Sequence, residues 1–295
     1  MKSLNFFLNN KAVKQNAAIF ISGSGTNAEK VLEYYFNQSE RNWTPAVIIT
    51  DAPKKSRAKE IAHKFDIPLI SHDIKDYYKK NGLRKVSLKT EVGRDIRQNW
   101  TNELRDLIST YSIDFGILAG FIPLTNITAD FPCLNIHPGD LTVEIDGKRL
   151  LIGLHTIPIE LAILNGHSHL RSSVILAQTY TGSGDGMDSG PILGISNLVP
   201  INLLDMTVDE LNKISIVRPS TRPYGGYKDK LEKVAKYNLE TLKQQGDWIV
   251  FPRVVSDFAS NKFAFDNNSN LFYKGNNGWI RINTVVYGIN IIKSI

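Results

Sequence analysis

The sequence predicts an α/β protein built on a mixed, mostly parallel β-sheet, with a helical and β-hairpin extension at its C-terminus. Three observations support this fold class. The 295 residues are 42% hydrophobic and 22% charged, which is the composition of a globular chain. Short β-branched runs alternate with amphipathic stretches through the first half, the pattern of βαβ units. A glycine-rich turn follows the first of these runs, as it does where a parallel strand leads into a helix.

In the first half, the apolar and β-branched runs predict strands, and the amphipathic stretches between them predict helices. The predicted strands cover residues 17–22, 46–50, 67–70, 115–120 and 134–137. The predicted helices cover residues 27–35, 56–65 and a long polar stretch from 77 to 111. The run FGILAG at 115–120 shows no alternation of apolar and polar residues, which is typical of a strand covered by helices on both faces.

The second half continues the sheet and then changes character beyond about residue 202. We predict a short buried helix at 157–165 and strands at 173–180 and 191–197, joined by a glycine-rich loop. Farther on, helices are predicted at 207–214 and 227–245, and the alternating runs on either side of 267–270 predict a hairpin. We therefore expect a main domain over residues 1–202 and a C-terminal extension, 203–295, packed on it.

Cysteine content and charge restrict the class of protein further. Cys133 is the only cysteine, which excludes an intrachain disulfide and favours a reducing, cytoplasmic location. No apolar run approaches the roughly 18 residues of a membrane helix, and residues 1–16 show no export signal. The net charge of +6 and the pI near 9.2 suit an anionic partner, whether a phosphorylated metabolite, a polyglutamyl cofactor or nucleic acid.

The glycine turn after the first predicted strand is a candidate phosphate site. Gly25, Thr26 and Asn27 open the first helix, where backbone amides face an anion without side chains in the way. The segment also fits G-x-G-x-x-A, and Asp51 ends the second strand, where a dinucleotide enzyme holds a ribose hydroxyl. A tight turn that only leads into the helix is the structural alternative.

Three polar residues near strand ends form the candidate catalytic group. Asn135 and His137 are two residues apart, so both side chains lie on one face of their strand. Asp188 lies at the turn before the last strand of the sheet, and a carboxylate beside His137 would keep the imidazole protonated. An amide donor, a cation and an anion, with no nucleophilic Ser or Cys, suit direct attack by a substrate amine on an acyl group through an oxyanion.

Each of these residues also has a structural interpretation. His137 alone fits a hydrogen-bonded structural histidine, and Asp188 alone fits a carboxylate that caps a turn. Their combination favours the catalytic interpretation. No metal site is predicted, because His167 and His169 are close together without another ligand nearby in sequence.

The segment from Lys54 to Arg105 is rich in lysine and arginine. Acidic residues interleave with these basic residues, so we interpret the segment as a solvated helical face. Arg94 or Arg97 is an alternative candidate for holding a substrate phosphate or the glutamate tail of a folate.

The order of five motifs resembles the folate-dependent formyltransferases, and the phosphoribosylglycinamide type in particular. The motifs are ISGSGTN (21–27), ILAGF (117–121), LNIHP (134–138), GLHT (153–156) and MDSGPIL (187–193). The resemblance covers roughly residues 17–205. It implies a Rossmann-like mixed sheet and an enzyme that moves a formyl group from 10-formyltetrahydrofolate to the primary amine of a phosphorylated small molecule, as in purine biosynthesis.

The resemblance also implies roles for individual residues. Asn135 and His137 would stabilise the oxyanion, and Asp188 would pair with His137 and relay a proton through water. Gly25, Thr26 and Asn27 would hold the substrate phosphate. The residues implied near the folate or the amine substrate are Gly120, Phe121, Ile122, Leu124, His155, Asp185 and Asp247.

The chain also departs from the family pattern. Pro138-Gly139-Asp140-Leu141 and an insertion, VEIDGKRLL, follow the histidine, and Ile122-Pro123-Leu124 replace the basic residue that often follows AGF. An amino-sugar nucleotide therefore remains an alternative acceptor. An NAD(P)-dependent oxidoreductase and a non-catalytic folate- or nucleotide-binding relative remain alternative functions. Membrane and nucleic-acid partners are not expected, and a homodimer is left open.

Overall fold

The computed structural model divides the chain into two compact units that interleave along the sequence. It describes residues 4–8, 14–179, 188–223, 225–288 and 292–294. Unit 1 consists of Met1–Ile136, Ile175–Pro191 and Phe251–Asn283, and unit 2 consists of His137–Val174, Ile192–Val250 and Thr284–Ile295. Both units thus draw on residues from each side of position 202. The division into residues 1–202 and 203–295 stays a prediction.

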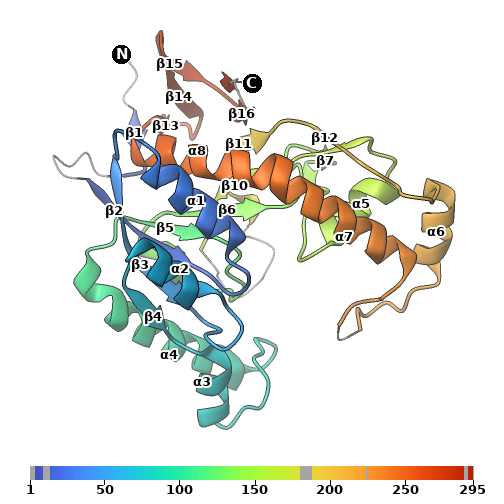
Figure 1. Ribbon diagram of the computed structural model, residues 1–295, viewed down its shortest axis with the longest axis horizontal. Helices are drawn as coiled ribbons and strands as arrows, with labels where there is room; N and C mark the ends of the chain where they lie inside the picture. Colours follow the sequence, from blue (N-terminus) through green and yellow to red (C-terminus); the bar gives the residue numbers. More distant parts are fainter. Residues whose placement is uncertain (1–3, 9–13, 180–187, 224, 289–291, 295) are drawn as a thin grey trace. The chain divides into compact units, whose positions relative to one another are not determined.

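The sheet of unit 1 confirms the predicted parallel α/β fold (Figure 1). Its strands are β2 (Gln15–Phe20), β3 (Trp43–Thr50), β4 (Leu69–Ser71), β5 (Phe115–Leu118), β6 (Cys133–His137) and the end of β10 (Ser173–Leu176). Their order is β10-β6-β5-β2-β3-β4, and the five strands from β6 to β4 are parallel to their neighbours. Sequence periodicity therefore located each of these strands to within a few residues.

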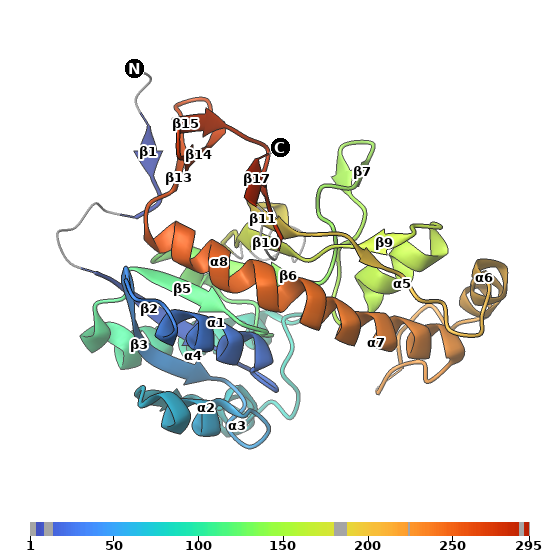
Figure 2. The same ribbon diagram turned by 45° about the horizontal axis from the view of Figure 1, so that its top comes forward.

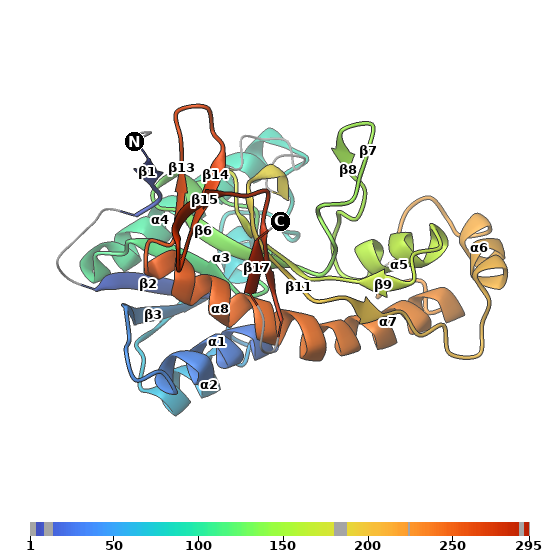
Figure 3. The ribbon, with the colours of Figure 1, turned by 90° about the horizontal axis from the view of Figure 1, so that it is seen from above.

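Helices cover both faces of this sheet, as the apolar strand at 115–120 predicts. They are α1 (Thr26–Phe36), α2 (Ala58–Phe65), α3 (Ile74–Lys80) and α4 (Glu91–Ile108), with 3₁₀ turns at Ser109–Tyr111 and Asn126–Ala129. Phe20 and Ile49 pack with Tyr78 of α3 and Trp100 of α4 in one buried cluster. Figure 3 shows α1 and α2 on the other face of β2 and β3.

The long helix predicted over 77–111 is broken, which corrects that expectation. Helix α3 ends at Lys80, and Gly82 adopts a left-handed conformation with φ +84° that a helix cannot continue through. Thr90 then begins α4, with its hydroxyl accepting a hydrogen bond from the Gly93 amide. Residues 81–90 are therefore a connecting loop that the amphipathic pattern did not reveal.

A separate antiparallel sheet in unit 1 confirms the predicted hairpin. It consists of β13 (Phe263–Phe265), β14 (Leu271–Gly275), β15 (Gly278–Arg281) and the N-terminal β1 (Asn5–Phe6). The order is β1-β13-β14-β15, so the N-terminal strand β1 pairs antiparallel with β13, which lies late in the sequence. Phe6 and Trp279 pack edge to face across this sheet, with ring centroids 5.7 Å apart.

Unit 2 has its own strands and a helical core. Its main strands are the start of β10, β11 (Ile192–Ser196), β16 (Val285–Tyr287) and β17 (Ile292–Ser294). Two short pairs of strands add to these. One pair is β9 (His169–Leu170) with β12 (Val199–Pro200), and the other is β7 (Glu144–Ile145) with β8 (Lys148–Arg149). Strand β16 pairs parallel with β11 and antiparallel with β17. Helices α5 (Ile157–Leu164), α6 (Val208–Ile216) and α7 (Lys230–Leu242) share one apolar cluster. The sequence insertion after Leu141 forms the β7–β8 hairpin, whose turn residues Asp146 and Gly147 both have positive φ.

The helix predicted over 227–245 begins later and continues farther than expected. Asp229 caps α7 by accepting from the Glu232 amide, and the helix passes through a π-helical turn at Lys243–Asp247 into α8 (Trp248–Ala259), as Figure 2 shows. A Cβ at Gly246 would lie 2.6 Å from Ser172 Oγ, so the close approach of the helix requires glycine there. None of the helices in the described part of the chain is long and apolar enough to cross a membrane.

Candidate active site

The carboxyl ends of four parallel strands of unit 1 bring several predicted residues to one sheet edge. The Ile21 amide bonds the Ile49 carbonyl and the Ala119 amide bonds the Phe20 carbonyl, so β2, β3 and β5 end in register. Asn135 on β6 lies opposite Leu118, the last residue of β5. Four features therefore lie at the ends of neighbouring strands, at the edge where α/β sheets bind ligands. They are the glycine turn, Asp51, the loop at Gly120 and Asn135.

The glycine turn has a backbone conformation that depends on glycine. Gly25 is the N-cap of α1 with φ +64°, and its carbonyl accepts from the Glu29 amide. A Cβ at Gly25 would lie 2.5 Å from Ile61 Cδ1, so both the positive φ and the packing against α2 exclude a side chain. The first amides of a helix have no carbonyl of their own helix to bind. Thr26 and Asn27 lie in that first turn, which is a favourable place for a phosphate.

Ser22, which sequence reasoning missed, joins this turn to two other strand ends. Its hydroxyl donates to Asp51 Oδ1 at 2.5 Å and accepts from the Ile122 amide at 2.9 Å. Both Ser22 and Asp51 are 6% exposed, and burial raises the pKa of Asp51 although the Ser22 bond opposes that rise. A carboxylate that is buried and already hydrogen-bonded in this way is not exposed for binding a ribose hydroxyl. The geometry thus argues against the dinucleotide-enzyme alternative.

Part of the loop after β5 packs on neighbouring residues, and part of it is exposed. Phe121 packs on Phe20 with ring centroids 5.2 Å apart, and the Leu124 carbonyl accepts from Arg97 Nη1 at 2.5 Å. Ile122 is 58% exposed, and a Cβ added to Gly120 would meet no atom within 4 Å. An exposed apolar side chain beside open space suits a flat, partly apolar ring such as a pterin.

His137 ends β6 with one ring nitrogen already hydrogen-bonded. The side chain is 3% exposed, and Nε2 lies 2.7 Å from the Leu151 carbonyl oxygen. Because a carbonyl oxygen can only accept, Nε2 carries a hydrogen and donates it. A Cβ at Gly139 would lie 2.6 Å from that carbonyl oxygen, so the Gly139 that departs from the family pattern makes room for this contact.

The three predicted catalytic residues are placed as follows. Asn135 is half-buried on β6 and shares one strand face with His137. Asp188 is half-buried in a short 3₁₀ turn that precedes β11. The pairing of Asp188 with His137 stays a prediction, and Asp185 lies outside the described residues.

The two remaining candidates both lie in unit 2. His155 is exposed and has φ +60°, a left-handed conformation that is uncommon for a residue with a side chain. Asp247 is 4% exposed in the π-helical turn and accepts from Ser172 Oγ at 2.5 Å. This bond gives Asp247 a structural role in addition to the substrate contact that the resemblance implies.

An ion-pair network that sequence reasoning missed fixes the residue after His155. Thr156 Oγ1 donates to Glu160 Oε1 at 2.8 Å, and Arg218 Nη1 lies 2.5 Å from Glu160 Oε2. Arg218 also binds Asp229 through two bonds of 2.7 Å. Burial alone would lower the pKa of the Arg218 guanidinium. Its hydrogen bonds to Asp229 and Glu160 outweigh that effect and raise the pKa. Among the described residues, no group of three or more His, Cys, Asp and Glu side chains could hold a metal.

One curated protein matches part of the chain in sequence. The chloroplastic phosphoribosylglycinamide formyltransferase of Arabidopsis thaliana is 24% identical over 208 residues, which are 69% of this chain and 63% of that protein. This chain therefore spans less than two thirds of the relative's length. No family model matches the chain.

Solved structures share the fold. The phosphoribosylglycinamide formyltransferase of Coxiella burnetii superposes with a TM-score of 0.58 at 18% identity, over 93% of this chain and 99% of the other. The enzyme of the same name from Anaplasma phagocytophilum gives 0.57 at 17% identity, over 89% and 95%. The fold is therefore that of the formyltransferases, a mixed and mostly parallel sheet with helices on its faces. In sequence and in fold, the chain is therefore similar to the phosphoribosylglycinamide formyltransferases.

Proposed function

We propose that this protein is an enzyme that transfers a formyl group from 10-formyltetrahydrofolate to the primary amine of a phosphorylated small molecule of the phosphoribosylglycinamide type. The observation that carries this proposal is the strand register in unit 1. It sets Asn135 opposite Leu118, near the loop at Gly120 and at the same sheet edge as the turn at Gly25. An oxyanion donor, a surface for a flat ring and a phosphate turn thereby share one edge.

In the proposed reaction, the amine nitrogen attacks the formyl carbon and the carbonyl oxygen becomes an oxyanion. The Asn135 amide donates to that oxygen, and protonated His137 supplies a second donor. The bond between Nε2 of His137 and the Leu151 carbonyl fixes the orientation of the ring. The bond between the formyl carbon and N10 then breaks, and a proton from the amine reaches N10 through a water held by Asp188.

Each substrate has its own binding residues in this proposal. Gly25, Thr26 and Asn27 hold the phosphate of the amine substrate at the start of α1. The loop from Gly120 to Leu124 lines the folate ring. The enzyme would act in purine biosynthesis in the cytoplasm, where its single buried cysteine needs no oxidising environment.

The test is a transfer assay with purified protein. The formyl donor is mixed with a panel of phosphorylated amines, including a glycinamide ribotide and an amino-sugar nucleotide, and release of tetrahydrofolate is followed by absorbance. Transfer to the glycinamide ribotide supports the proposal. Transfer only to the amino-sugar nucleotide changes the acceptor, whereas folate binding without transfer to any amine identifies a non-catalytic relative.

A further inference from the structure

We propose that Arg218 is a positioning residue: through the buried Glu160 it fixes the short segment that presents His155 to the amine substrate. The proposal rests on the function proposed above. All three residues belong to unit 2. The proposal gives part of the chain beyond residue 202, which the sequence predicts only as an extension, a role in substrate binding.

The segment that carries His155 lies beside the candidate catalytic histidine. At its start, the Leu151 carbonyl accepts from His137 Nε2 at 2.7 Å. Leu151 and Thr156 are buried at the two ends of the segment, whereas Leu154 and His155 between them are exposed. A segment that contacts His137 and exposes an imidazole is therefore well placed to contact a substrate.

The backbone of His155 has a conformation that its surroundings must hold. Its φ of +60° is left-handed, which residues with a side chain rarely adopt. Gly153 has φ +121°, and a Cβ there would lie 2.9 Å from Ile157 Cγ2, so the segment folds tightly against the start of α5. A conformation of this kind persists only where neighbouring contacts fix it, and such positions are concentrated at functional sites. Because His155 itself is exposed, we look to its buried neighbour Thr156 for those contacts.

Thr156 is held by a carboxylate of its own helix. Its hydroxyl donates to Glu160 Oε1 at 2.8 Å, and its carbonyl accepts from the Glu160 amide at 2.9 Å. The other oxygen, Glu160 Oε2, lies 2.5 Å from Arg218 Nη1. A buried carboxylate is stable only when a cation pairs with it. The hold of Glu160 on Thr156 therefore depends on Arg218.

Arg218 is fixed in turn by contacts on two sides of its guanidinium. It follows α6 by two residues and makes two hydrogen bonds of 2.7 Å to Asp229, the residue that caps α7. The Tyr227 ring lies under the guanidinium, with 4.0 Å from Cζ to the ring centroid. One planar group thus joins α5 to the start of α7. A lysine has the same charge but lacks the planar set of donors that these simultaneous contacts use.

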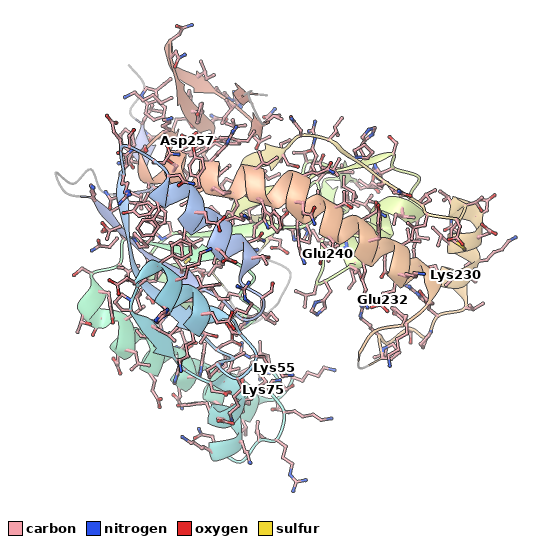
Figure 4. The ribbon with its side chains drawn as sticks, viewed as in Figure 1. Lys55, Lys75, Lys230, Glu232, Glu240 and Asp257 are labelled. Atoms are coloured by element: carbon pink, nitrogen blue, oxygen red, sulfur yellow. The ribbon has the colours of Figure 1, made fainter. Side chains whose placement is uncertain are left out.

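A second ion pair keeps the loop between α6 and α7 in place. Arg222 Nη2 lies 2.5 Å from Oε1 of Glu232, which is in the first turn of α7 (Figure 4). The Lys228 amide donates to Glu232 Oε2 at 2.6 Å. A Cβ at Gly226 would clash with both of these carboxylate oxygens, so the close approach of the loop requires glycine there. Arg218 is therefore carried by a loop with a defined conformation.

The exposed imidazole suits contact with the amine substrate. A ring nitrogen without a hydrogen accepts a hydrogen bond from a primary amine and leaves the lone pair of that amine free for attack on the formyl carbon. Such a contact is made before and during the reaction, so its loss raises KM for the amine more than it lowers kcat. The KM of the formyl donor should not respond.

Steady-state kinetics of Arg218→Lys in the full-length protein tests the proposal, with glycinamide ribotide as the amine. Alanine would leave a buried carboxylate without a cation, so lysine is the safer substitution for folding. We expect KM for the amine to rise about tenfold, and kcat and KM for the folate to stay within about threefold. The matched control is Arg105→Lys in unit 1, whose guanidinium also bonds an aspartate, Asp130, at 2.6 Å. The control should keep both KM values, and an unchanged amine KM in Arg218→Lys would overturn the proposal.

A double-mutant cycle distinguishes positioning from a general structural effect. If Arg218 acts through His155, Arg218→Lys should raise the amine KM no further in a His155→Ala background. If the two substitutions instead raise KM by independent factors that multiply, Arg218 does not act through His155 and the proposal fails.

The histidine NMR signals provide a measurement that does not depend on catalysis. Histidine-labelled protein has six histidines, and the His155 ring signals are assigned as those missing in His155→Ala. Arg218→Lys should shift or broaden the His155 signals and leave those of His63 in unit 1 unchanged. Unchanged His155 signals would overturn the proposal even in an active enzyme. Shifted His155 signals in a protein that formylates no amine would support the positioning by Arg218 while the transferase proposal fails.

Discussion

Ser22 Oγ lies 2.5 Å from Asp51 Oδ1 and donates a hydrogen bond to it, while the same oxygen accepts from the Ile122 amide. One buried hydroxyl thereby connects the glycine turn after β2, the end of β3 and the loop after β5. In the proposed function, the turn binds the amine substrate and the loop binds the folate. Both binding regions of unit 1 therefore depend on the same pair of side chains.

Replacing Ser22 by Ala should weaken both regions and the fold together. The substitution removes the donor to a buried carboxylate and the acceptor of a backbone amide, and leaving such groups unsatisfied costs roughly 2 kcal/mol or more of unfolding free energy. We expect raised KM values for both the amine and the folate, measured by steady-state kinetics, and a lowered urea midpoint. Ser24→Ala is the matched control because Ser24 is exposed in the same turn. Equal behaviour of the two variants would contradict the role of Ser22.

Replacing Asp51 by Asn should remove a pH dependence of stability. Burial raises the pKa of Asp51 above its ordinary value of 3.8, so the folded state holds this proton more tightly than the unfolded chain. The contribution of Asp51 is then most favourable below the ordinary pKa and is lost as pH rises through the raised pKa. Asn keeps an acceptor for Ser22 without a charge. We expect the variant to gain stability relative to wild type as the pH rises above 3.8, the ordinary pKa, measured by urea unfolding. A difference in stability that does not change with pH would refute the assignment.

The sequence predicted the strands and most helices well because their apolar periodicity is strong, as at 46–50 and 115–120. It missed the break after Lys80, because Gly82 and the contact of Tyr78 with Gly93 depend on tertiary packing that no periodicity encodes. The sequence analysis also missed Ser22, although its position directly before a glycine turn could have indicated a role for its hydroxyl. The network of Arg218 could not be predicted, since its partners are up to 58 residues away in the sequence.

Substituting the candidate catalytic residues should reduce turnover without unfolding the protein. Loss of one oxyanion donor typically costs about 10²–10³ in kcat. We therefore expect decreases of that order for Asn135→Ala and His137→Ala, and a comparable decrease for Asp188→Asn. Far-UV circular dichroism and thermal unfolding serve as checks on folding. His63→Ala, an exposed histidine of α2, is the control and should retain wild-type kcat. A variant at Asn135 or His137 with wild-type turnover would remove that residue from the mechanism.

The glycine turn offers a pair of substitutions that differ in backbone conformation. Gly25→Ala forces a side chain into φ +64° and to within 2.5 Å of Ile61 Cδ1, so we expect a loss of about 1–3 kcal/mol of unfolding free energy and a raised KM for the phosphorylated amine. At Gly23 a Cβ would meet no atom within 4 Å. Gly23→Ala should therefore leave the unfolding free energy close to that of the wild type. Equal destabilisation by the two substitutions would show that the conformation of Gly25 does not shape the turn.

Asp247 has two proposed roles, and a double-mutant cycle with Ser172 separates them. If the carboxylate chiefly stabilises the π-helical turn, Ser172→Ala and Asp247→Ala should each lower the unfolding free energy by about 1–3 kcal/mol, and the double variant should lose less than their sum. Asp247→Asn keeps an acceptor for Ser172 and should then retain near wild-type stability and KM. If the carboxylate also contacts the amine substrate, Asp247→Asn should instead raise the KM of that substrate about tenfold or more with stability unchanged. The Asp247 side chain is 4% exposed and its Oδ1 already accepts from Ser172, so we expect the structural role and near wild-type KM for Asp247→Asn. If the losses of the two single variants simply add in the double variant, the structural role is excluded.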